Sequence, residues 1–144
     1  YHPDSSSTLQ SSYSRQYNLR DEYDKHRPLN DSLANLNHPE LHYELTTHNA
    51  ELNYNKNISS NWNCAIGFNG LKQRNTYSGR FFIPNFESFA GGVFIQQNWK
   101  KNRLQIEAGG RYDYKQLQAF MWRNNVIYTP SKEFSNLSGT IGAR

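Results

Sequence analysis

The sequence predicts an all-β fold: an antiparallel meander of about six long strands that forms part of a large transmembrane β-barrel. Apolar and polar residues alternate with a period of two along much of the chain, as they do in strands with one wet face. The alternating segments are longer than the ~5–6 residues that are usual in soluble proteins. The connections are long and short in turn, which is typical of outer-membrane barrels with long extracellular loops and short periplasmic turns.

The composition favours such strands over an ordinary soluble core. Only 35% of the 144 residues are hydrophobic, and the mean hydropathy is −0.93. Low apolar content is also typical of disorder, but disordered segments contain few aromatic residues, and here aromatic residues make up 15%. No run of ~18 apolar residues is present, so no transmembrane helix is expected. A barrel strand needs only ~10 residues of alternating hydrophobicity.

Charge and cysteine content exclude several classes of function. The net charge is +4, but the basic residues are scattered along the chain, whereas nucleic-acid binding needs a clustered basic face. Nucleic acid is therefore not an expected partner, and no cofactor is expected. Cys64 is the single cysteine, which rules out an intrachain disulfide and a multi-cysteine metal site.

A first strand is expected over 9–23, where apolar residues fall on one parity and polar residues on the other. Arg15 and Asp21 interrupt the apolar parity, near where the strand is expected to leave the membrane. A second strand is expected over 41–57, and its apolar residues change parity midway. They run first through Leu41, Tyr43 and Leu45, then through Ala50, Leu52 and Tyr54. The change indicates either a β-bulge or a strand that leaves the bilayer partway along its length.

Three further strands are expected over 62–73, 87–99 and 103–122, and a sixth begins after residue 133. The connections are expected at 24–40, 57–61, 74–86, 100–102 and 123–133. Aromatic residues cluster toward the strand ends, as in the girdles that mark bilayer interfaces. They are Tyr23, Tyr43, Trp62, Trp99, Tyr112, Tyr114, Phe120 and Trp122.

The alternation also predicts which side chains face lipid. Those expected to point outward are Ile66, Phe68, Val93, Ile95, Leu104 and Ile106. Those expected to point into the lumen are Gln96, Gln105, Glu107 and Arg111. Because periplasmic turns are short in outer-membrane barrels, the loops 24–40, 74–86 and 123–133 are expected outside the cell.

Several segments resemble strands of Bacteroidetes-type TonB-dependent receptors: 20–27, 82–89, 104–114 and 134–143. The third is similar to a strand common in that family. It carries Glu107, Gly109, Arg111, Tyr112 and Asp113 in the family's order and spacing. The resemblance covers the chain from about residue 10 onward.

The resemblance implies a receptor in the cell outer membrane that takes up a scarce ligand actively, most often a ferric siderophore or another iron complex. It implies outer-membrane lipid, TonB and a plug domain as partners, and no enzymatic activity. Residues 1–144 are expected to be a partial barrel domain, without the plug domain, the TonB box and the C-terminus of the barrel. Two other interpretations stay open: a passive porin-like barrel, and a soluble β-rich binding module.

Three sets of residues are candidates for a site. Glu107, Arg111 and Asp113 share the inward parity of one strand and form a lumen-facing charge network, because residues two apart lie on one face. That network is expected to meet the plug domain, with direct contact to substrate as the alternative. Tyr77, Arg80 and Phe82, in an expected extracellular loop, are candidate ligand-binding residues, with packing against the barrel rim as the alternative.

His38 and His42, four residues apart, are the third set. That spacing suits a pair of metal ligands on a helix, but Pro39 lies between them and the segment is expected to be a loop that enters a strand. Histidines in a loop near a polar rim are the favoured interpretation, and no metal site is expected. No motif for a catalytic nucleophile supports an enzyme.

Overall fold

The computed structural model describes residues 6–23, 39–79, 83–123 and 126–144. They form strands throughout, with no helix among them. The strands are β1 Ser7–Glu22, β2 Leu41–Ser59, β3 Trp62–Gly79, β4 Asn85–Lys101, β5 Leu104–Arg123, β6 Val126–Tyr128 and β7 Ser131–Ala143. Accordingly, the described ranges hold no helix that is long and apolar enough to cross a membrane.

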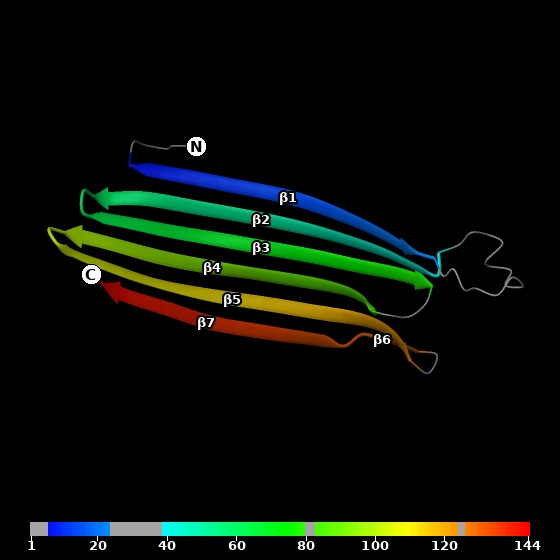
Figure 1. Ribbon diagram of the computed structural model, residues 1–144. Helices are drawn as coiled ribbons and strands as arrows, with labels where there is room; N and C mark the ends of the chain where they lie inside the picture. The colour runs from blue at the N-terminus through cyan, green and yellow to red at the C-terminus, as the bar shows by residue number, and fades with distance from the viewer. Residues whose placement is uncertain (1–5, 24–38, 80–82, 124–125) are drawn as a thin grey trace, which may run out of the picture.

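The strands form one antiparallel meander, as the sequence predicts. Each of β1 to β5 pairs with its neighbour in the chain, and β5 pairs with both β6 and β7. Figure 1 shows them side by side in a long, gently curved sheet with every connection at one of two ends. We call these the turn end, which carries the β2–β3 and β4–β5 connections, and the loop end, which carries the others.

The two connections at the turn end are tight. Ser60 and Asn61 join β2 to β3, and Asn102 and Arg103 join β4 to β5. Asn102 has a φ of 55°, a conformation that Asn tolerates better than most residues. The two short turns that the sequence predicts are therefore confirmed, with bounds shifted by one to three residues.

Two connections at the loop end are shorter than the sequence predicts. The expected loop 74–86 is wrong, because β3 continues to Gly79 and β4 begins at Asn85. Residues 75–79 pair with β2, but their polar composition lacks the alternation of apolar and polar residues from which a strand is predicted. Gly79 ends the strand with a φ of 89°, and a side chain there would meet the Glu40 carbonyl. The expected loop 123–133 is also wrong, since it contains β6 and the start of β7.

The sheet has two faces, which we name after Ile66 and Arg111. Residues directly opposite each other on paired antiparallel strands project to the same side, so the pairing assigns each side chain to a face. The six residues expected to face lipid all lie on the Ile66 face, and the four expected to face the lumen all lie on the Arg111 face. Many apolar side chains on the Ile66 face are exposed, including Val93 at 51%.

The character of each face reverses partway along the strands. Toward the turn end the Ile66 face is apolar, and from the row of Phe89 to the loop end it carries charged and polar residues. These are His42, Glu44, His48, Lys72, Arg74, Glu87 and Glu133. The Arg111 face does the opposite and becomes apolar near the loop end. Its apolar residues there are Leu41, Tyr43, Leu45, Leu71, Tyr77, Phe86 and Leu117.

This reversal explains the change of parity in β2. The pairing of β2 with β1 and β3 runs without interruption from Leu41 to Asn57, and the one register shift lies between Asn57 and Ser59. A β-bulge at the change of parity is therefore wrong. The strand stays regular while its apolar residues change face, so a strand that leaves the bilayer partway along its length stays the prediction.

Aromatic residues bound the apolar part of the Ile66 face. Trp62 lies directly opposite Trp99 toward the turn end, and Phe89 marks the other limit. Trp99 and Phe89 are ten positions apart on β4, which is ~33 Å along a strand. With a tilt of about 40°, that path rises ~25 Å, the height of the lipid-facing band of a barrel. Tyr43, expected in a girdle, lies instead on the Arg111 face.

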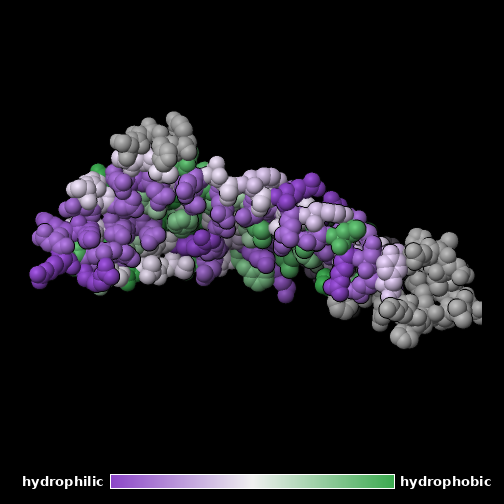
Figure 2. All heavy atoms as spheres, turned by 45° about the horizontal axis from the view of Figure 1, so that its top comes forward, coloured by the Kyte–Doolittle hydropathy of each residue, from purple (hydrophilic) through white to green (hydrophobic). Residues whose placement is uncertain are grey.

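In the space-filling view, hydrophilic residues cover the turn end, and hydrophobic patches lie along the middle of the strands (Figure 2). The described residues contain almost no closed core: Leu41, at 6% exposure, is the buried hydrophobic residue among them, and none of their side chains is fully buried. The exposed apolar surface of the sheet is therefore a surface for contact with a membrane or with another protein.

Candidate functional site

The best-defined polar cluster on the Arg111 face joins β3 to β5. The Arg111 guanidinium donates to both carboxylate oxygens of Asp113, at 2.8 Å from Nε to Oδ2 and 2.6 Å from the terminal nitrogen to Oδ1. The same terminal nitrogen donates to Oδ1 of Asn69 at 2.7 Å. This fork-like geometry fixes the Arg111 side chain across the intervening strand.

Gly92 makes that crossing possible. It lies on β4, directly between Asn69 of β3 and Asp113 of β5. A Cβ atom on Gly92 would lie 2.6 Å from the Arg111 nitrogen and 3.0 Å from Asn69 Oδ1, and it would also meet Asp113 Oδ1. A side chain at this position would displace the ends of the Arg111, Asp113 and Asn69 side chains, so glycine allows them to close over the backbone of β4.

Glu107 belongs to a separate group. Its Oε1 accepts hydrogen bonds from Gln105 at 2.6 Å and from Asn98 at 3.1 Å. The structure therefore brings Arg111 and Asp113 together, as expected, but joins Glu107 to amides instead. The two groups are four residues apart on β5, which is ~13 Å along a strand.

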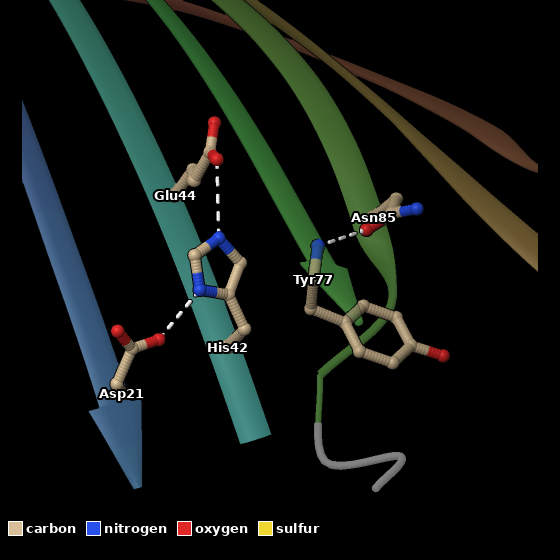
Figure 3. Close-up of polar contacts among 5 residues, drawn as sticks. All are labelled: Asp21, His42, Glu44, Tyr77 and Asn85. Carbon is tan, nitrogen blue, oxygen red and sulfur yellow. Dashed lines mark hydrogen bonds and ion pairs between the residues drawn. The ribbon is translucent and has the colours of Figure 1, made fainter. Parts of the chain in front are cut away.

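Of the expected ligand-binding residues, Tyr77 is described, while Arg80 and Phe82 lie outside the described residues. Tyr77 is in β3 on the Arg111 face, not in a loop. Its ring lies 6.3 Å from that of Tyr43, between centroids, and its backbone nitrogen donates to the Asn85 side chain at 2.7 Å (Figure 3).

Two unpaired polar atoms lie in the same region. The Tyr43 hydroxyl and the Asn75 side-chain nitrogen are buried, and neither has a hydrogen-bond partner within the described ranges. Leaving such a group unpaired costs about 1–3 kcal/mol. The sequence analysis placed Tyr43 in an interfacial girdle and did not single out Asn75, because neighbours across three strands are not visible in a local pattern. We call Tyr43, Asn75, Tyr77 and Phe86 the loop-end cluster.

On the opposite face, His42 lies between two carboxylates. It contacts Asp21 of β1 and Glu44 of β2, at 3.1 Å from Nε2 to the Glu44 oxygen (Figure 3). The hydrogen bonds with Glu44 and Asp21 raise the pKa of His42 above its ordinary value of 6.5. His38 lies outside the described residues, and no group of three potential metal ligands is present among the described ones.

A long antiparallel sheet with a lipid-height apolar band on one face and a polar opposite face defines the wall of an outer-membrane β-barrel. The chain belongs to the family of TonB-dependent receptors: a family model described as "TonB dependent receptor-like, beta-barrel" matches residues 1–143. A search of curated proteins finds no match.

Family membership has direct consequences for the protein. It is part of a receptor located in the outer membrane, and members of the family are transporters, not enzymes. Receptors of this family work with TonB, a plug domain and a ligand. Membership also decides against the passive porin and the soluble binding module.

Proposed function

We propose that this sheet is a sector of the wall of a receptor that takes up a ferric siderophore or another iron complex by energised transport. The sheet does not close on itself, since β1 pairs with β2 alone and β7 with β5 alone among the described residues. A plugged outer-membrane transporter barrel has about 22 strands. The remaining wall, the plug domain and the TonB box would come from the rest of the receptor, which we propose is of the Bacteroidetes type.

In this arrangement the Ile66 face contacts lipid and the Arg111 face lines the lumen. The turn end is periplasmic and the loop end is extracellular, because the family keeps periplasmic turns short. The polar half of the Arg111 face, including Arg111, Asp113 and Glu107, meets the plug domain. The loop-end cluster then lies on the wall of the extracellular vestibule, where a ligand arrives.

One observation carries the assignment of the ligand site: the buried, unpaired Tyr43 hydroxyl and Asn75 nitrogen beside aromatic rings. Aromatic surface with a few convergent polar atoms is typical of binding sites. Tyr77 contributes from the wall, and Arg80 and Phe82 follow β3 directly in the sequence. An arginine there suits an anionic ligand such as a siderophore complex.

The test measures binding of a ferric tricatecholate siderophore to the purified full-length receptor. Tyr43→Phe removes the hydroxyl and keeps the ring, so folding is preserved and affinity should fall about three- to tenfold. Tyr17→Phe, an exposed tyrosine on the Ile66 face, is the matched control and should bind as the wild type does. Unchanged affinity in Tyr43→Phe would remove the loop-end cluster from ligand binding.

A further inference from the structure

Three basic residues lie side by side on the Ile66 face. Arg15 of β1 is directly opposite His48 of β2, and His48 is directly opposite Lys72 of β3. Directly opposed residues have Cβ atoms about 4.5–5.5 Å apart. We call these three residues the basic row.

The basic row lacks compensating charge. Arg15 and Lys72 are exposed, and neither makes an ion pair with any residue that the structure describes. On β1 to β4, the row itself and the rows on either side of it contain a single carboxylate, Glu87. That carboxylate lies 3.5 Å from Arg74. Like charges placed opposite each other destabilise a sheet, so the row favours an anion from outside the chain.

His48 has a hydrogen-bond partner in the neighbouring row of the sheet. Its Nδ1 lies 2.7 Å from the Tyr13 hydroxyl. When that hydroxyl donates to Nδ1, the neutral ring carries its proton on Nε2 and presents a donor beside the two cations. The row therefore offers one imidazole and two charged donors on an open surface.

The position of the row identifies the anion. The neighbouring row on the turn-end side of the basic row contains Tyr13, Ala50 and Gly70, which are uncharged. On the loop-end side of the basic row, further charged residues follow. The basic row is thus the first charged row above the apolar band, at the level where lipid headgroups meet hydrocarbon. Tyrosine beside it suits that interface. A soluble anion would gain nothing from the apolar surface below, whereas a lipid contacts both.

We propose that the basic row binds the phosphate group of an outer-leaflet lipid whose acyl chains lie along the apolar band. The inference rests on the orientation given under the proposed function, with the Ile66 face toward lipid and the loop end outside the cell. Removing one cation near a charged lipid surface weakens binding about fivefold, so removing two should weaken it about 25-fold.

The experiment titrates the full-length receptor in detergent with lipid A and follows bound lipid by native mass spectrometry. The probes are phosphate-bearing lipid A and the same lipid after enzymatic removal of its phosphates. The test variant is Arg15→Gln with Lys72→Gln. The control is Arg20→Gln with Lys115→Gln, which removes the same charge from the Arg111 face.

We expect the wild type and the control to prefer the phosphate-bearing lipid, and the test variant to lose that preference. Equal binding of the two lipids by the wild type would overturn the inference, and so would equal losses in both variants. Thiol labelling of the two ends of the sheet separates the possible failures. Inverted labelling overturns the orientation and this inference together, whereas expected labelling without a lipid preference overturns this inference alone.

Discussion

At the residue scale, the contact of Arg111 with Asn69 on the Arg111 face depends on a small residue between them. Arg111 reaches Asn69, which is 42 positions earlier in the chain, only by lying across β4. Gly92 provides the gap. The contact therefore depends on three strands at once, and changing the smallest of these residues should disturb it most.

Gly92→Ala is expected to destabilise the receptor by about 1 kcal/mol, because the new Cβ displaces the Arg111 side chain from its hydrogen bonds with Asp113 and Asn69. Gly110→Ala is the matched control, because a Cβ at Gly110 meets no atom within 4 Å. Urea unfolding of the full-length receptor in lipid vesicles measures both. A smaller loss for Gly92→Ala than for Gly110→Ala would contradict the crossing of Arg111 over β4.

His42 predicts a pH dependence at the loop end of β1 and β2. Its pKa in the folded protein is raised by Glu44 and Asp21, so its stabilising contribution is full below about pH 6.5. That contribution is lost as the pH rises through the raised pKa. Hydrogen exchange near Asp21, corrected for intrinsic rates, should therefore show stronger protection at pH 5.5 than at pH 8.5. His42→Gln should abolish the difference and His48→Gln should retain it.

At the element scale, each strand is a continuous extended segment that passes through two environments. Near the turn end a strand presents apolar residues on the Ile66 face, and near the loop end it presents them on the Arg111 face. The backbone needs no irregularity to do this, since β2 keeps its register across the change. The boundary between environments lies near Phe89, and substitutions on either face should report it.

Val93→Arg should destabilise the barrel by about 2–4 kcal/mol, because it places a charge on the lipid-facing side near the middle of the apolar band. Gln96→Arg, on the opposite face of the same strand, should have a much smaller effect. Folding of the full-length receptor into bilayers gives both free energies. Equal effects of the two substitutions would show that the Ile66 face does not contact lipid.

The ends of the strands can be located by thiol labelling on intact cells in a Cys64→Ala background. Ser78→Cys, exposed near the loop end, should react with a membrane-impermeant reagent. Ser60→Cys, in the β2–β3 turn, should not. Ser78 is preferable to Gly79, whose φ of 89° disfavours any side chain. If Ser60→Cys reacted and Ser78→Cys did not, the assignment of the two ends of the sheet to the two sides of the membrane would have to be reversed.

At the scale of the whole molecule, the sheet has two strand edges that lack a partner among the described residues. β1 and β7 border the sheet on opposite sides (Figure 1), and exposed edges favour association with other strands. In a closed barrel those edges would pair with further wall strands, so we expect the sheet to be stable only within a larger assembly.

The isolated segment 1–144 in detergent should therefore form oligomers, whereas the full-length receptor should be monomeric. Size-exclusion chromatography with light scattering measures both masses. A monomeric segment whose β1 and β7 amides are protected from exchange would show that the edges are satisfied without the rest of a barrel.

The sequence by itself determined the six long strands, their antiparallel order and the face of the side chains near the turn end. Alternation is a local property of a strand, so residues such as Ile66, Val93 and Arg111 reveal their facing without knowledge of their neighbours. The pairing of Arg111 with Asp113 was predictable for the same reason, because residues two apart share a face.

Only the tertiary structure decided which residues of neighbouring strands lie opposite each other. The continuation of β3 to Gly79, the loop-end cluster and the basic row each depend on register across a connection, which local patterns do not encode. Arg15, His48 and Lys72 are far apart in the sequence and adjacent in the sheet. Register is set by backbone pairing and by the burial of one face along the whole strand, and both are properties of the assembled sheet.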